Sequence, residues 1–181
     1  MPDTPDSSAL YAAISAYASL GAVACALLVV WLQNRSAKRL LGFQLFAQMA
    51  TQYESQEMLQ ARSRLADALL ADEATPQIDE TLLVHYENVA LLERKGLIDR
   101  QLIWNIYSHD VPRYWLAVRS YVQASRETYL APWLFEEFED LSKRFKLLKQ
   151  SPLGTPLRHH DISLSDLRDF LRGERNRAVK H

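Results

Sequence analysis

The chain has 181 residues, 48% of them hydrophobic, and a formal net charge of −1 at pH 7. This length suits one compact domain with an additional segment, and from residue 33 onward 21 basic side chains face 22 − 2 = 20 acidic ones, because Asp3 and Asp6 come earlier. The balance argues against a nucleic-acid-binding protein that works through bulk positive charge, and the single cysteine, Cys25, excludes an intramolecular disulfide.

The first predicted element is an apolar helix over residues 8–32, which contain no Asp, Glu, Lys, Arg, His, Pro or Asn. At about 1.5 Å per residue, a helix of this length exceeds the roughly 30 Å hydrocarbon core of a bilayer. Trp31 suits the membrane interface. We therefore expect a single transmembrane helix after a short tail, residues 1–7. A cleaved signal peptide would need a basic leading segment, and a buried core helix seldom lacks charge over such a length.

The charges that flank this helix predict its orientation. Arg35, Lys38 and Arg39 follow the apolar run closely, whereas only Asp3 and Asp6 precede it. Positively charged residues near the end of a span favour the cytoplasmic side. The N-terminus is therefore expected outside and the following domain in the cytoplasm.

Residues 36–150 predict a compact all-α bundle of five or six helices, because apolar residues recur with the helical period and no stretch alternates as a strand would. The first of these helices is expected to continue from the span to about Gln52. Ser55 is a typical N-cap for the second, and Asp79 for the third. Gly96 suits the left-handed position after the third helix ends.

Further along, Asp99 is expected to open a short helix, Pro112 to begin a longer one, and Pro132 to begin the next. Residues 151–181 read as a connector, a short helix and a polar tail. Ser163 and Asp166 form a capping pattern at the start of that short helix, which is predicted to end at Gly173. The basic residues of the tail are expected either to touch anionic lipid or to keep a frayed end soluble; they are Arg172, Arg175, Arg177 and Lys180.

No common catalytic motif is present: the chain has no G-x-S-x-G, H-E-x-x-H, C-x-x-C, G-x-G-x-x-G or phosphate-binding glycine loop. No cofactor and no metal are therefore expected. Three local groups of metal-ligating residues are each too small to bind a metal ion without distant partners. They are His85 with Glu87, His109 with Asp110, and His159, His160 and Asp161.

The helix that follows Pro112 carries a broad aromatic face. This face is expected to pack in the core, since large aromatic residues at helical spacing dominate small-domain cores. An alternative is a surface for a partner, formed by Arg113, Tyr114, Trp115 and Arg119.

The segment YENVALLERKGLID, residues 86–99, followed by QLIWNIYSHDVPRYW, resembles a bacterial family of small membrane proteins known only as a domain of unknown function. The segment TQYESQEMLQARSRL, residues 51–65, fits the same pattern. The resemblance covers about residues 36–140. It implies one N-terminal span, a helical domain and a bacterial inner-membrane setting, and it carries over no catalytic residues.

Two functions remain open from the sequence. The first is a membrane-anchored cytoplasmic module without catalytic activity of its own, which binds a protein partner or assembles with itself as an accessory or regulatory part. Its expected partners are the lipid bilayer and protein, not nucleic acid. The second is a membrane-bound hydrolase that uses His and carboxylate groups from different helices, such as His85, Glu87 and His109.

Overall fold

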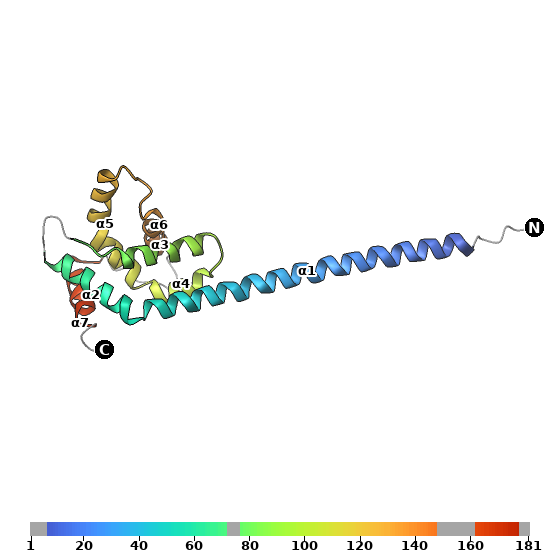
Figure 1. Ribbon diagram of the computed structural model, residues 1–181, viewed down its shortest axis with the longest axis horizontal. Helices are drawn as coiled ribbons and strands as arrows, with labels where there is room; N and C mark the ends of the chain where they lie inside the picture. The colour runs from blue at the N-terminus through green and yellow to red at the C-terminus, as the bar shows by residue number, and fades with distance from the viewer. Residues whose placement is uncertain (1–6, 72–76, 148–161, 178–181) are drawn as a thin grey trace, which may run out of the picture. The chain divides into compact units, whose positions relative to one another are not determined.

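A computed structural model describes residues 7–71, 77–147 and 162–177, which form seven helices and no strand (Figure 1). The all-α class is therefore confirmed for these residues. The chain divides into an N-terminal unit, Met1–Leu41, and a C-terminal unit, Gly42–His181. In chain order, the helices are α1 (Ser7–Tyr53), α2 (Gln56–Leu70), α3 (Thr81–Arg94), α4 (Arg100–Tyr107), α5 (Asp110–Thr128), α6 (Glu136–Leu147) and α7 (Leu164–Arg177).

The N-terminal unit consists of the first part of α1. Its apolar side chains are exposed from Val23 to Leu32, and the guanidinium of Arg35 lies 5.5 Å from the centre of the Trp31 ring. Within the described residues, no helix carries an apolar stretch long enough to cross a bilayer. For residues 8–20 of the predicted span, Tyr17 is the one side chain described, and the side chain of Arg39 also lies outside the description.

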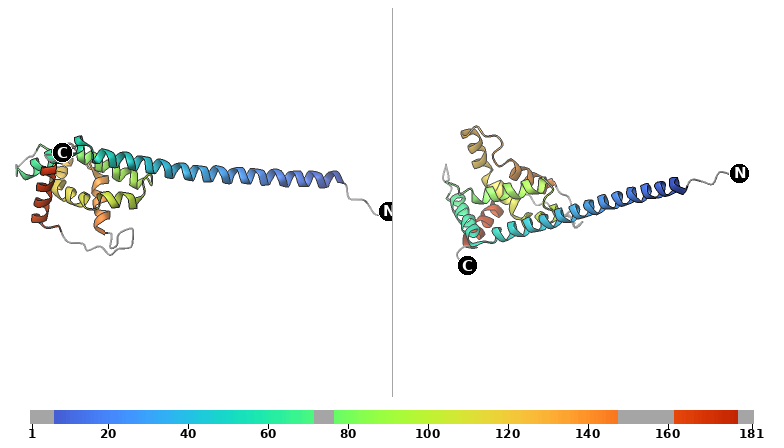
Figure 2. Two further views of the ribbon diagram at one scale, coloured as in Figure 1. Left: turned by 90° about the horizontal axis from the view of Figure 1, so that it is seen from below. Right: turned by 45° about the vertical axis from the view of Figure 1, so that its right-hand side comes forward.

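The C-terminal unit holds the core. Its strongest helix pairings are α2 with α7, α3 with α6, and α5 with α6, and α7 lies beside α2 in all views (Figures 1 and 2). The buried apolar residues come from every helix of the unit, so the last helix is part of the packed structure. The largest fully buried ones are Tyr86, Tyr107, Tyr114, Phe138, Met58, Leu65, Leu82, Leu83, Ile103 and Leu141.

The end of α1 packs through a different face from the one that an apolar stripe suggests. Leu40 and Phe43 are exposed, whereas Gly42 and Tyr53 are buried and Leu45, Phe46 and Met49 lie against the core. Gly42 determines which side of α1 packs on the core, because a Cβ at this position would overlap the carbonyl oxygen of Leu97. The glycine therefore allows a close approach between α1 and the turn after α3.

Several helix ends lie where local chemistry predicts them. The side chain of Ser55 accepts a hydrogen bond from Met58 N at 3.2 Å, and that of Asp99 accepts one from Gln101 N at 2.7 Å. Gly96 has φ +65° just after α3, in the left-handed position. Ser163 and Asp166 form a reciprocal capping pair at the start of α7, with distances of 3.1 and 3.2 Å.

Four predicted boundaries were wrong. The N-cap of α3 is Glu80 instead of Asp79, although the Asp79 side chain still accepts from Thr81 N. Pro112 is the third residue of α5 instead of its first, and α6 begins at Glu136 instead of Pro132. The delay of α6 arises because Leu130 and Phe135 both adopt positive φ, 52° and 56°, so residues 130–135 form a turn. Helix α7 does not end at Gly173 but continues to Arg177, since Glu174 on its last turn is buried.

Candidate functional site

A buried polar network joins α1, α2, α3, α5 and α7, and Arg62 lies at its centre. The Nε of Arg62 donates to Glu174 at 2.6 Å, and its Nη2 lies 3.6 Å from a carboxylate oxygen of Asp110. The guanidinium also lies 4.4 Å from the centre of the Tyr53 ring. Arg62 and Glu174 are each only 1% exposed, so each charge is balanced inside the protein by the other.

Three tyrosine hydroxyl groups complete this network. Tyr53 donates to Asp110, and because its one proton is used there, Tyr86 must donate to Tyr53 across 2.9 Å. Tyr114 donates to Glu174 at 2.7 Å. Burial raises the pKa of all three hydroxyls, so they remain protonated donors at neutral pH.

The ionic state of Arg62 depends on its partner. Burial alone would lower the pKa of Arg62, but the hydrogen bond from its guanidinium to Glu174 and the neighbouring charges raise it above the ordinary value. The residue lies on the buried face of α2, between Met58 and Leu65 in an otherwise apolar stripe. A charge buried in that position is stable only when it is paired with an opposite charge. The ion pair therefore couples α2 and α7 by electrostatics as well as by packing.

His85 lies beside the network and is kept neutral. Its Nε2 is 3.2 Å from the Tyr107 hydroxyl, and its ring stacks on Tyr53 with centres 5.5 Å apart. Burial, and then the charge of Arg62, lowers the pKa of His85 to about 4. Its Nδ1 is buried and has no hydrogen-bond partner within the described part of the chain.

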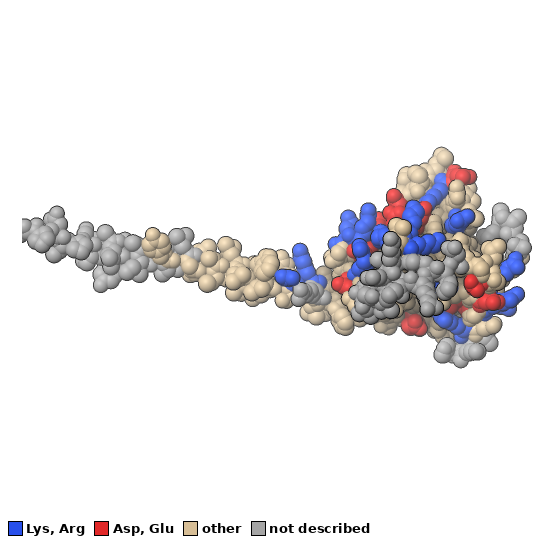
Figure 3. Space-filling model, turned by 180° about the vertical axis from the view of Figure 1, so that it is seen from behind, with Lys and Arg blue, Asp and Glu red and all other residues tan. Residues whose placement is uncertain are grey.

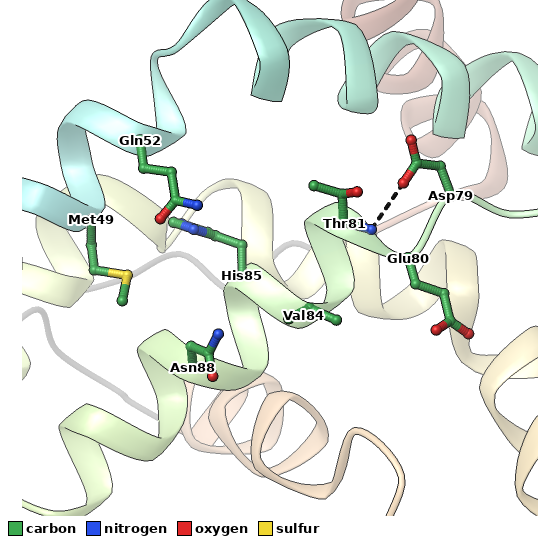
Figure 4. A pocket seen from close by; sticks show the side chains of 8 residues that line it. All are labelled: Met49, Gln52, Asp79, Glu80, Thr81, Val84, His85 and Asn88. Atoms are coloured by element: carbon green, nitrogen blue, oxygen red, sulfur yellow. Dashed lines mark hydrogen bonds between the residues drawn. The ribbon is translucent and has the colours of Figure 1, made fainter.

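A pocket of about 390 Å³ opens next to His85 (Figure 4). Met49 and Gln52 of α1 and Val84 and Asn88 of α3 line it together with His85. The volume falls within the roughly 300–1,000 Å³ typical of small-molecule sites. At its other end, Figure 4 shows Asp79, Glu80 and Thr81 at the start of α3.

The acidic groups of this pocket are already in use. Asp79 accepts from Thr81 N at 3.0 Å and pairs with Arg64 at 2.6 Å. Glu80 accepts a hydrogen bond from the Tyr121 hydroxyl at 2.6 Å, and burial together with this bond raises the pKa of Tyr121 to about 12. These contacts position the start of α3 instead of leaving two free carboxylates for chemistry.

Two further carboxylates hold helices together. Glu93 of α3 is buried and bridges Arg100 of α4, at 2.6 Å, and Arg144 of α6, at 2.8 Å. Glu87 accepts hydrogen bonds from the backbone N–H groups of Glu137 and Phe138, at 3.3 and 2.8 Å. Because these belong to the first turn of α6, Glu87 caps that helix from α3.

The three residues proposed for a hydrolase have separate roles. His85 contacts Tyr107, Glu87 caps α6, and the exposed His109 lies with its Nδ1 2.8 Å from Asp110. No hydrogen bond or ion pair joins any two of the three, so the geometry gives the hydrolase hypothesis no support. The described residues also contain no group of three or more metal-ligating side chains, and His159, His160 and Asp161 lie outside them.

The four residues considered as a partner surface do not share one environment. Tyr114 is buried and bonded to Glu174, which makes it part of the core, as expected for the aromatic face, and not part of an exposed partner surface. Trp115 is half-buried against Phe138, with ring centres 5.3 Å apart. Arg113 bonds to the carbonyl of His109 at 2.6 Å, and Arg119 is exposed.

The roles of Glu174 and Arg62 were not predicted from the sequence. Glu174 falls within a basic segment that looks like a solvated tail, but Leu167 and Leu171 precede it at spacings of seven and three residues. That spacing places all three on one helix face, which is the signal that could have identified it. Three of the tail cations have carboxylate partners: Arg172 pairs with Asp169, Arg175 lies 3.9 Å from Asp67, and Arg177 pairs with Glu174, whereas Lys180 lies outside the described residues.

Comparison with known proteins gives a family but no activity. No curated protein and no solved structure matches the chain. Residues 13–145 match the family described as a domain of unknown function, DUF4760. This match covers most of α1 and all of α2 to α5, and it ends within α6. The chain therefore belongs to the DUF4760 family.

Proposed function

We propose that this protein is a membrane-anchored helical interaction module, with its C-terminal unit at the cytoplasmic face of a bacterial inner membrane and no reaction of its own. The observation that carries the proposal is the course of α1. One helix includes the apolar run up to Leu32, the cations Arg35 and Lys38, and Tyr53 in the core of the C-terminal unit. Such a helix would provide the folded unit with a membrane anchor in its own first helix.

The surface of α1 supports the anchor. From Val23 to Leu32 its described large apolar side chains are about half exposed or more, an arrangement that water disfavours and lipid accepts. The uncharged run continues N-terminally to residue 8 in the sequence. Arg35 and Lys38 then supply the positive charge that favours the cytoplasmic side.

The interior of the C-terminal unit supports a binding role. Its buried charges, Arg62, Glu93 and Glu174, are engaged with other helices, and its buried tyrosines are donors with raised pKa values. These groups stabilise the packing of the helices, and they do not supply a general base or a nucleophile at the surface.

The anchor is tested by placing charge in the apolar run. The full chain is expressed in a bacterium, and membranes are extracted with alkaline carbonate. We expect wild-type protein in the pellet and the double variant Leu20→Arg/Val23→Arg in the supernatant, because these positions lie at or near the middle of residues 8–32 and each arginine at a span centre costs about 2.5–3.5 kcal/mol. Gln44→Arg, on the exposed part of α1 beyond the run, is the matched control and should stay in the pellet. Wild-type protein in the supernatant would refute the anchor.

The binding role is tested by crosslinking the full chain at native abundance. We expect reproducible crosslinks to another protein or to a second copy. A chain that is monomeric in mild detergent and gives no reproducible crosslink in cells would refute the interaction module, whatever the outcome of the extraction.

A further inference from the structure

The turn between α5 and α6 presents three large apolar side chains to solvent. Tyr129 is 71% exposed, Leu130 83% and Trp133 67%, and we call these three residues the apolar tip. Scattered single apolar residues are common on protein surfaces, but a cluster within five residues of one turn is typical of an interaction site.

The backbone conformation of Leu130 is unfavourable for a residue with a side chain, so the presence of leucine at this position needs an explanation. The N–H of Leu130 bonds to Glu127 O at 3.4 Å and that of Ala131 to Arg126 O at 3.0 Å, which closes α5 with a Schellman motif. Such a motif needs a left-handed residue, and Leu130 has φ 52°. Glycine is favoured there, because a side chain in this conformation crowds the backbone.

The end of α3 provides a comparison within the same chain. Gly96 and Leu97 make the same two hydrogen bonds, to Glu93 O at 2.9 Å and to Leu92 O at 3.0 Å, and here the left-handed residue is glycine with φ 65°. Leu130 thus occupies a position where the chain elsewhere uses glycine, and its exposed side chain gains no burial in return. Backbone strain without a compensating contact in the monomer points to a contact made in a complex.

The charges around the apolar tip are acidic. Glu127 precedes it and Glu136 follows it, both exposed. The cation nearest to the tip in the sequence, Arg126, forms an ion pair with Glu139 at 2.7 Å and a hydrogen bond with the carbonyl of Leu134 at 2.8 Å. The tip therefore complements an apolar recess with a basic rim, and it does not suit an anionic lipid surface.

The same chain carries a recess of this kind. A cavity of about 160 Å³ is lined by Phe145 and Leu147 of α6, by Arg100 and Arg144, and by Glu93. Both arginines share the single carboxylate of Glu93, which leaves excess positive charge, and Leu147 is exposed. Figure 3 shows Lys and Arg side chains gathered on one face of this unit, with Asp and Glu side chains among them. We call this recess the basic pocket; it is smaller than the roughly 300 Å³ at which small-molecule sites begin, so it suits a side chain.

We propose that the apolar tip of one copy docks in the basic pocket of a second copy. Trp133 and Leu130 contact Phe145 and Leu147, while Glu127 and Glu136 lie opposite Arg100 and Arg144 of the other copy. This deepens the interaction module proposed above by naming its partner. The contact joins two different surfaces, so each copy offers one tip and one pocket.

The test compares two single variants of the full chain in mild detergent by light scattering after size exclusion. Trp133→Ser removes the tip anchor, and Leu147→Glu replaces an exposed apolar residue of the pocket with a charge and leaves the ion pairs of Glu93 intact. We expect wild-type protein to self-associate and each variant to do so about 30-fold more weakly or worse, the loss typical of an interface hot spot. Leu164→Ser, an equally exposed apolar position on α7, is the matched control and should associate as wild type does.

Mixing the two variants separates this arrangement from other modes of association. The Leu147→Glu copy keeps an intact tip and the Trp133→Ser copy keeps an intact pocket, so an equimolar mixture should recover a dimer that neither variant forms alone. Wild-type protein that stays monomeric, variants that associate as wild type does, or a mixture that recovers no dimer would each overturn the proposal. If wild type is monomeric but crosslinks reproducibly to another protein, this pairing is refuted while the interaction module stands.

Discussion

Arg62 and Glu174 form an ion pair in the protein interior, and both side chains are shielded from water. We expect Glu174→Ala to lower the free energy of unfolding by about 3–5 kcal/mol, because it leaves the Arg62 guanidinium buried without its strongest partner. The measurement is urea unfolding of the full chain. Arg172→Ala, on the exposed side of the same helix, should change the stability by less than about 1 kcal/mol. An equal effect of both substitutions would show that Glu174 contributes only as any residue of α7 does.

His85 should make stability depend on pH. Its folded pKa of about 4 lies below the ordinary value of 6.5, so the unfolded chain binds the proton more tightly and stability falls as pH drops through this window. Between pH 7.5 and pH 5 we expect a loss of about 2 kcal/mol from this residue. Urea titrations at the two pH values should show that His85→Gln removes this part of the slope, whereas Val84→Ala, on the exposed neighbour, retains it. The same slope in both variants would contradict the assignment.

Leu130 offers a substitution that should stabilise the monomer. Replacing it with glycine removes the left-handed strain at an exposed site, so we expect Leu130→Gly to raise the free energy of unfolding by about 0.5–1 kcal/mol. Tyr129→Gly, one residue earlier at φ −93°, should lower the stability instead. Glycine relieves no backbone strain at that position, and it raises the conformational entropy of the unfolded chain. The comparison is made by thermal unfolding. Two changes of the same sign would argue against strain at Leu130.

At the scale of elements, the start of α6 depends on a residue of another helix, because Glu87 of α3 caps its first turn. Glu87→Ala leaves the first N–H groups of α6 without their acceptor and should cost about 1–2 kcal/mol. Hydrogen exchange should locate the effect at Glu137 and Phe138. Glu87→Gln should restore most of the protection, because an amide oxygen also accepts, and Asn88→Ala should leave it unchanged. Uniform loss of protection across the unit would contradict a local cap.

Helix ends also show what the sequence could predict. Ser55, Asp99, Gly96 and the Ser163–Asp166 pair act on backbone groups within three residues, so their chemistry is visible locally. Pro132 misled the prediction because a proline suits a turn as well as a first helical residue, and the partner that fixes the start of α6 is Glu87, fifty-one residues away from Phe138. The pairing of Arg62 with Glu174 was missed for the same reason, since these residues are 112 positions apart.

At the scale of the whole molecule, the proposed anchor makes a prediction about topology. A reporter fused after His181 should be cytoplasmic, because Arg35, Lys38 and Arg39 follow the apolar run. Replacing all three with glutamate should move a substantial fraction of the reporter to the other side. Lys95→Glu, far from the run in sequence, should not. A periplasmic reporter on the wild-type chain would overturn the proposed orientation.

The ion pair between Arg62 and Glu174 also sets an order of events during synthesis. Chains grow at about 5–20 residues per second, so Glu174 is added roughly 6–22 s after Arg62, across the 112 positions that separate them. Until then Arg62 lacks its strongest partner on the apolar face of α2, and Tyr114 lacks its hydrogen-bond acceptor. During this interval the growing chain exposes polar groups that the folded protein buries, so a chaperone or a second chain would have access to them.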